Sequence, residues 1–356
     1  MSVAIREPQI PTKPTPFVKV RLDWLNKRHE RPLEPDLPIV DPHYHLWVRP
    51  GDDYLLKDML ADMNSGHNVW AAVAVEGKGF YRTDGPVELR TVGETEFLFR
   101  QLAETDPKIL GDRQPCAGVV ANADLTLGAK VKGVLEAHKE AAGNRLRGIR
   151  LGAATHADPA LRLTISQPPA GLLADRSFRE GYAVLKEFDL SFDAWVYHPQ
   201  IPEVADLARA FPDTTIILDH MGAPLGVGPY ASRREETLRE WRANLAGLAK
   251  CPNVNVKVGG FGVPSFGLDF SAYDDPPSSE ELASAWRPLI ETCVELFGPT
   301  RCMFESNFPV DKGMFSYGCL WNALKIVSKQ YSPDDRKALF GGTASKAYRL
   351  TAPGKA

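Results

Sequence analysis

The chain has 356 residues, of which 44% are hydrophobic and 24% are charged, with a formal net charge of -3 and a sequence pI of about 6.3. This length and composition can form a large core and are consistent with one large domain or two ordinary ones. The absence of a basic excess or polybasic run argues against nucleic-acid and membrane partners. Five widely spaced cysteines predict reduced thiols rather than a disulfide framework. No secretion signal or apolar run of about 18 residues is present, so we expect a cytoplasmic protein.

Two units follow from the distribution of proline and charge. Residues 1–36 are rich in both, and we interpret them as an N-terminal Pro-rich arm that wraps the domain or a second copy in a homodimer. The alternative is a disordered tail. Residues 37–352 contain neither a low-complexity linker nor a repeat of 20 to 50 residues, which predicts a single domain.

Runs with strand character alternate with segments of helical spacing along this domain. Because each parallel return needs a crossover, eight such units predict an α/β protein with a (β/α)8 TIM barrel. The alternative, an open doubly wound sheet, would need a glycine-rich turn after its first strand, and Asp41-Pro-His43-Tyr-His45 has none. The expected strands are 39–40, 69–75, 117–120, 146–151, 191–197, 215–218, 254–258 and 302–304, and the expected helices are 55–63, 91–104, 128–142, 177–188, 202–211, 233–250, 279–297 and 317–329.

Long connections follow three of the expected strands, at residues 77–90, 152–174 and 259–278. In a parallel barrel these long βα loops lie at the C-terminal face, where active sites are built. We therefore expect them to cover a site for a small molecule.

Histidines mark the same face. His43 and His45 stand at positions i and i+2, so their side chains share one face of an extended chain. His198 and His220 also follow strand-like runs, which places four of the eight histidines just past expected strands.

Four motifs occur in the order of the strands: Asp41-Pro-His43-Tyr-His45, Tyr197-His198-Pro-Gln200, Leu218-Asp-His220-Met-Gly222-Ala-Pro224 and Met303-Phe-Glu-Ser-Asn307-Phe-Pro309-Val310. Together they resemble the amidohydrolase superfamily, and within it the amidohydrolase-2 branch of lactone hydrolases and non-oxidative decarboxylases. The resemblance spans roughly residues 38–350.

The resemblance implies a role for each histidine. Members with a metal hold it with the strand-one pair, here His43 and His45, a strand-five histidine, here His198, and a strand-eight aspartate. His220 corresponds to the strand-six histidine that hydrogen-bonds the substrate or orients the attacking water. One divalent metal, zinc or manganese, is expected on this basis, and a metal-free mechanism stays open.

The strand-eight motif departs from the family pattern because Asn307 replaces the aspartate, and an amide is neither a general base nor a good metal ligand. Glu305 shares the face of Asn307 one layer deeper, and Asp311 lies four residues later, so either can supply the missing carboxylate. Alternatively, a substrate carboxylate or a His220 tautomer acts as base. A buried ion pair for Glu305 and a helix N-cap for Asp311 are the structural alternatives.

Charged residues inside apolar runs need a partner or a polar cavity. Arg150 suits recognition of a substrate carboxylate, and Lys257 is a second such cation. The alternative is that each pairs with Glu76 or Glu305 inside the barrel. Glu76, which directly follows the second expected strand, and Tyr81 and His156, on long loops, complete the expected substrate-binding residues.

We interpret the chain as a hydrolase that opens a lactone or related cyclic ester or amide of a small, carboxylated substrate by attack of water on a polarised carbonyl. A metal-dependent non-oxidative decarboxylase of an aromatic or unsaturated acid is the second hypothesis. A non-catalytic ligand-binding barrel is the third, motivated by Asn307.

Overall fold

The structure is a computed structural model that describes residues 5–11, 15–49 and 51–351. Its centre is one eight-stranded parallel sheet in which each strand pairs with the next along the chain. The sheet curves round so that Tyr44 pairs with Phe308, and the His45 N–H donates to the Phe308 carbonyl at 2.7 Å. The strands are β1 (Ile39–Tyr44), β2 (Val69–Val75), β3 (Gln114–Ala121), β4 (Leu146–Ile149), β5 (Ser191–Ala194), β6 (Ile216–Leu218), β7 (Val254–Val258) and β8 (Cys302–Phe304).

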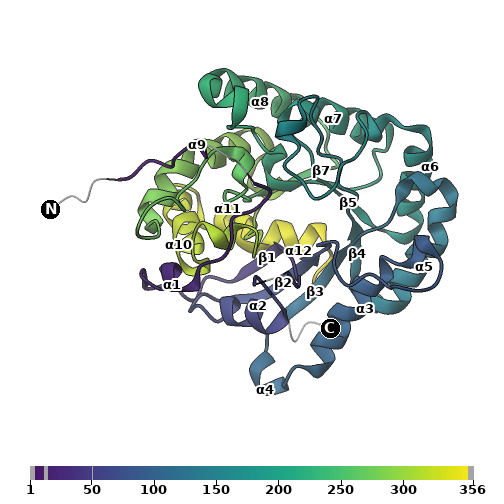
Figure 1. Cartoon of the computed structure of the whole chain (residues 1–356), viewed down its shortest axis with the longest axis horizontal. Coiled ribbons are helices and arrows are strands. Elements are labelled where there is room, and N and C mark those ends of the chain that lie inside the picture. The colour runs from purple at the N-terminus through teal and green to yellow at the C-terminus, as the bar shows by residue number, and fades with distance from the viewer. Residues whose placement is uncertain (1–4, 12–14, 50, 352–356) are drawn as a thin grey trace.

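Helices surround the strands, as Figure 1 shows. The predicted (β/α)8 barrel is therefore confirmed. The α-helices are α1 (Leu22–Leu25), α2 (Leu56–Met63), α3 (Val92–Glu104), α4 (Pro107–Leu110), α5 (Val131–Ala142), α6 (Arg176–Val184), α7 (Ile201–Ala210), α8 (Arg234–Leu248), α9 (Ser279–Phe297), α10 (Tyr317–Ser328), α11 (Pro333–Lys337) and α12 (Thr343–Ala347).

Local sequence fixes where the helices begin. Ser278 caps α9: its hydroxyl accepts from the Glu281 N–H, and the Glu281 carboxylate accepts from the Ser278 N–H at 2.8 Å. This reciprocal arrangement satisfies two donors that would otherwise have no partner in the first turn. Asp175 and Ser316 cap α6 and α10 with single side-chain acceptors.

The strands differ from the expected ranges mainly in length. β1 continues to Tyr44 instead of ending at Val40, and β5 ends at Ala194 although strand-like residues continue to Tyr197. The pairing of β5 with β6 ends at Ala194 and Leu218, because β6 itself ends there and the chain turns. His198, which follows β5, and His220, which follows β6, therefore lie outside the regular sheet.

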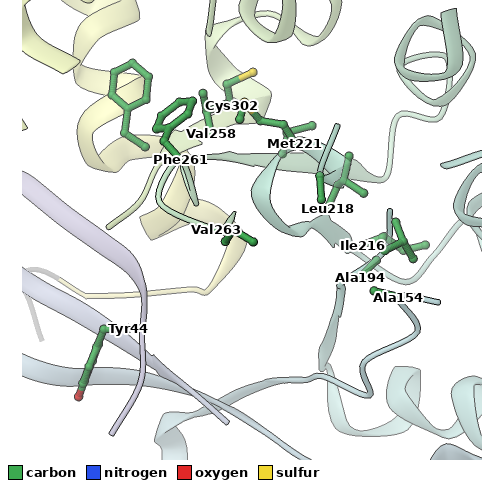
Figure 2. Close-up of a cluster of buried hydrophobic side chains, with 14 of the residues drawn as sticks. Tyr44, Ala154, Ala194, Ile216, Leu218, Met221, Val258, Phe261, Val263 and Cys302 are labelled. Atoms are coloured by element: carbon green, nitrogen blue, oxygen red, sulfur yellow. The ribbon is translucent and has the colours of Figure 1, made fainter. Parts of the chain in front are cut away.

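Apolar side chains fill the space between the strands and the helices, and Figure 2 shows part of this core around Leu218, Met221 and Phe261. A second, smaller cluster joins the strands to the C-terminal segment. In it, strand residues such as Val40 and Ile217 pack with Tyr348, which follows α12. Helix α12, which was not expected from the sequence, thus packs against the barrel strands.

The described part of the arm runs against α9 and the segment before it (Figure 1). Arg6 Nη2 donates to Glu281 at 2.8 Å, Gln9 pairs with Asp269, and Trp24 Nε1 donates to the Tyr273 carbonyl at 2.9 Å. Among the described helices, none combines the length and the apolar character needed to cross a membrane.

Candidate active site

A cavity of about 110 Å³ opens where the strands end. Its walls come from the residues that follow seven of the strands and from the arm, the arrangement typical of barrel enzymes. Its lining residues are Pro16, Phe17, His45, Trp47, Arg49, Glu76, Gly77, Lys78, Arg150, Gly152, Leu163, Thr164, Ile165, Ser166, Trp195, His220, Val263, Asn307 and Val310.

The histidine pair at the end of β1 lies at the inner end of this cavity. His43 and His45 are buried, and their Nε2 atoms are 3.1 Å apart. His45 Nδ1 is 3.0 Å from the Val75 carbonyl, which fixes that nitrogen as the donor and leaves Nε2 without a proton. Burial lowers the pKa of His43 to about 4 and that of His45 well below its ordinary value, so both imidazoles are neutral near pH 7.

A second pair joins β6 to β8. His220 Nδ1 lies 2.7 Å from Glu305 Oε1, and Glu305 Oε2 lies 3.0 Å from His43 Nδ1. Burial alone would raise the pKa of Glu305, but His220 and His43 lower it to about 2, so the carboxylate is ionised. Because Nδ1 of His220 faces Glu305, Nε2 is the free ring nitrogen of this cavity-lining side chain.

Two glycines after β7 make room for this pair. A Cβ at Gly259 would lie 2.3 Å from Glu305 Cγ, and a Cβ at Gly260 would lie 2.5 Å from His220 Cγ. Real side-chain contacts are much longer than these separations, so any larger residue would displace the pair. The sequence Gly259-Gly260 is thus part of the site although neither residue carries chemistry.

The backbone at His220 is strained. His220, Met221 and Ala223 have φ values of 51°, 56° and 37°, a region that residues with side chains rarely adopt. Such strain persists only where surrounding contacts enforce it, and it is frequent at functional sites. Here the Trp241 Nε1 donates to the Met221 carbonyl at 2.7 Å and holds the turn in place.

A network of buried charges lies beneath the histidines, which we call the barrel-floor network: Glu76, Arg150, Asp193, Asp219 and Lys257. Arg150 donates to Glu76 Oε1 at 2.7 Å and to Asp219 at 3.3 Å, and Lys257 donates to Asp193 at 2.6 Å. Both cations thus have buried carboxylate partners. For Arg150 the partner is Glu76, as in the alternative that this arginine forms an ion pair inside the barrel. Lys257 Nζ also lies 3.0 Å from His43 Nδ1, which links this network to the histidine pair.

Asn307 lines the cavity and carries a buried hydrogen-bond acceptor. Its Nδ2 donates to Asp311 Oδ1 at 2.8 Å, and the Gly262 N–H donates to Asp311 Oδ2 at 2.9 Å. With Nδ2 used in this way, Asn307 Oδ1 is buried and has no hydrogen-bond partner among the described residues. A buried acceptor of this kind costs free energy unless a ligand or water satisfies it.

The side chains present fit a divalent transition metal. His43, His220 and Glu305 offer one ligand atom each, and these atoms lie within 4.8 Å of one another. Neutral imidazole nitrogen and carboxylate oxygen are the donors that zinc prefers in catalytic sites. The barrel-floor network and Glu305 together contain four buried carboxylates and two cations. This surplus of negative charge favours the binding of a further cation.

Three expected site residues lie elsewhere. His198 Nδ1 accepts from the Leu225 N–H at 3.3 Å, and its carbonyl accepts from Asn244. His198 is therefore not part of the group of possible metal ligands described above, which differs from the expectation that it lies with His43 and His45. The reason is that the chain turns after β5, so that residue 198 begins the short helical turn before α7. Tyr81 and His156 are absent from the described cavity wall, and His156 Nε2 instead lies 3.0 Å from the Tyr230 hydroxyl.

Several residues of the cavity wall and of the barrel-floor network were not expected from the sequence. Trp47 and Arg49 continue the alternation of His43 and His45 and could have been found by extending it. Asp219, which directly precedes His220, carried no signal of its own. Phe17 comes from the arm, and its place on the wall depends on tertiary contacts that local pattern does not reveal.

A parallel barrel with imidazoles and a carboxylate at the C-terminal ends of its strands defines the class of TIM-barrel enzymes. The chain belongs to the amidohydrolase family: the Amidohydro_2 family model, described as amidohydrolase, matches residues 40–350. It is accordingly a hydrolase-type enzyme.

Relatives match nearly the full barrel. The uncharacterized protein y4mH of Sinorhizobium fredii is 32% identical over 338 residues, which are 88% of this chain and 99% of that protein. An L-fucono-1,5-lactonase of Burkholderia multivorans is 26% identical over 331 residues, 89% of this chain and 98% of that protein. The crystal structure of an amidohydrolase from Burkholderia multivorans with bound HEPES has a TM-score of 0.67 and 25% identity, and the match covers 88% of this chain and 99% of that one.

Proposed function

We propose that the chain hydrolyses a lactone or a related cyclic ester of a small molecule. The observation that carries the proposal is the His220–Glu305 pair, 2.7 Å apart, at the wall of a cavity at the strand ends. An imidazole held by a buried carboxylate is a recurrent arrangement for removing a proton from an attacking nucleophile. The similarity to an L-fucono-1,5-lactonase supports the choice of a cyclic ester.

In the proposed reaction, the substrate carbonyl lies against His45 and Arg150, and water occupies the space between His220 and Asn307. Asn307 Oδ1 accepts one water proton in a hydrogen bond and orients the oxygen. His220 Nε2 takes the other proton as the oxygen attacks the carbonyl carbon, and Glu305 stabilises the imidazolium that forms. His220 then returns this proton to the leaving alkoxide when the ring C–O bond breaks, which gives the hydroxy acid.

The group of His43, His220 and Glu305 would hold a divalent metal, with His45 beside it. With His220 as a ligand, neither of its ring nitrogens would be free to take a proton, so the reaction above, with His220 as the base, is that of the protein without a metal. When bound, such an ion supplies Lewis-acid polarisation of oxygen. Arg150 lines the same cavity and is positively charged, so the protein itself also provides a cationic group for the carbonyl oxygen.

A panel of lactones tests the proposal, assayed with protein stripped of metal and with protein loaded with zinc or manganese. We expect hydrolysis of at least one ring ester and a loss of at least about a hundredfold in kcat in His220→Asn, the scale of a lost general base. His138→Asn is the matched control, because His138 is equally buried but contacts Thr95 and Asn122 away from the cavity.

Two results would contradict the proposal. Release of carbon dioxide from aromatic or unsaturated acids without hydrolysis of any lactone would identify a decarboxylase. Saturable ligand binding without turnover in either metal state would identify a binding barrel.

A further inference from the structure

The face that carries the histidine pair continues outward from the barrel. His43, His45, Trp47 and Arg49 occupy alternate positions, and the last three line the cavity. The rings of His45 and Trp47 are nearly parallel at 11° with centroids 6.4 Å apart, and the Arg49 guanidinium lies 3.6 Å from the Trp47 ring centroid. These two separations place the guanidinium within about 10 Å of the His45 ring.

Arg49 is a cation at the cavity wall. Asp52 acts on its guanidinium through space, but no carboxylate of the described residues forms an ion pair with it, and its Nη1 is buried without a hydrogen-bond partner. The two neighbouring aromatic rings, Trp47 and Phe17, contact it at 3.6 Å and 4.2 Å. Burial lowers the pKa of Arg49 from its ordinary value, yet a guanidinium stays charged in proteins. An anion would therefore be stabilised here.

Lys78 adds a second charge to the same wall. It follows β2 with φ of 60°, an unfavourable conformation that places it at the cavity. Arg150, the cation first expected to bind a substrate carboxylate, already has Glu76 and Asp219 as partners. Arg150 is thus left to the uncharged carbonyl oxygen of the substrate, and the cations available to a substrate carboxylate are Arg49 and Lys78.

We propose that Arg49 and Lys78 form a subsite for a carboxylate on the substrate, so that the enzyme acts on a lactone that carries an acid group remote from the reacting carbonyl. This inference rests on the proposed function. The guanidinium can donate two parallel hydrogen bonds to a carboxylate, a geometry that an ammonium cannot reproduce. The separation of at most about 10 Å between Arg49 and His45 restricts the substrate to about one ring with its acid substituent, in keeping with the size of the cavity.

The arm completes this subsite. Phe17 contacts the guanidinium from the arm, whose described residues are held against α9 by Arg6 and Glu281. A cation fixed between two rings loses little conformational freedom when it binds an anion, which strengthens binding.

Two paired measurements test the subsite. In the first, a carboxylated lactone is compared with its methyl ester in the wild type and in Arg49→Gln. We expect KM for the acid to rise about 10- to 100-fold, the scale of lost charge-assisted hydrogen bonds, with little change in kcat and little change for the ester. Arg100→Gln is the matched control, because Arg100 also stacks on a ring, that of Phe97 at 5.4 Å, but lies outside the cavity wall.

The second measurement does not need turnover. Benzoate and benzamide are titrated against the same variants by calorimetry. We expect benzoate to bind the wild type more tightly than benzamide does, and Arg49→Gln to lose that preference. The subsite would be overturned if benzoate bound the wild type and Arg49→Gln equally tightly. It would also be overturned if KM rose equally for the carboxylated lactone and its methyl ester in the first assay. Selective benzoate binding in a protein that hydrolyses no lactone would leave the subsite standing and contradict the proposed function alone.

Discussion

Glu305 lies 2.7 Å from His220 Nδ1 and occupies the space that Gly259 leaves open. The residue two positions later, Asn307, lines the cavity, has no charge and carries a buried oxygen without a hydrogen-bond partner among the described residues. In the family pattern, an aspartate at the position of Asn307 would carry the negative charge near the imidazole. Here Glu305 carries this charge, one layer deeper in the barrel. This relationship makes Glu305 a positioning residue for His220 and gives Asn307 a different task.

Removing the Glu305 charge tests its role. We expect Glu305→Gln to lower kcat by about a hundredfold while KM changes little, because the neutral amide no longer stabilises the imidazolium that forms during the reaction. The folded state is checked by circular dichroism and the two constants by steady-state kinetics. An unchanged kcat in a folded variant would show that Glu305 only balances buried charge.

Asn307→Asp should not restore an ordinary family site. The new carboxylate would face Asp311 at the 2.8 Å contact now made by the amide, and two carboxylates at that distance cannot both ionise without a cation. We therefore expect higher metal affinity, measured by competition with a chelator, and equal or lower turnover. The double variant Asn307→Asp/Asp311→Asn removes the charge conflict and should regain part of any lost turnover. A strong rise in turnover in the single variant would contradict this account.

The strand-one pair should matter for chemistry more than for folding. Replacing His43 or His45 with alanine should reduce turnover at least about a hundredfold in a protein that still folds, because the side chains lie at the end of β1 and not among its packed apolar residues. Thermal unfolding and activity are measured together. Loss of the folded state in both variants would assign these residues to the structure of the barrel.

Gly259→Ala tests the space reserved for Glu305. The added Cβ would lie 2.3 Å from Glu305 Cγ and 2.7 Å from its carbonyl oxygen, so the strand or the side chain must move. We expect a loss of about 1–3 kcal/mol in unfolding free energy and at least about tenfold in kcat. Gly247→Ala in α8 is the control, since nothing lies within 4 Å of its Cβ and alanine favours a helix. A Gly259→Ala enzyme with normal kcat would mean that the pair tolerates displacement.

The barrel could be predicted because each of its units has a local signature. Short apolar runs such as those of β2 and β7 are distinct from the helical spacing between them, and parallel pairing requires the crossovers that the helices supply. The C-terminal packing of Tyr348 against the barrel strands had no such signature, because it depends on contacts with residues that are distant in sequence.

The site could be predicted only where residues stay close to a strand end. His43 lies within β1, His45 directly follows it, and His220 comes two residues after β6. The structure brings them together with Glu305. His198 comes four residues after β5, and in that interval the chain turns toward α8, where Asn244 contacts its carbonyl. Sequence spacing does not record such a turn.

Acid should release the arm from α9. Burial alone would raise the pKa of Glu281, but hydrogen bonds from Arg6 and from the Ser278 N–H lower it to about 2, below its ordinary value of 4.5. A lowered pKa contributes stability that is present above pH 4.5 and is lost as the pH falls toward 2. We therefore expect the protection factors for hydrogen exchange in residues 5–11, which compare each rate with the intrinsic rate at the same pH, to fall across that window in the wild type. Glu281→Gln should exchange faster at neutral pH and lose this dependence, whereas Glu291→Gln, on the same helix but paired with Arg287, should behave as wild type. Protection that persists in the wild type at pH 2 would show that other contacts hold the arm.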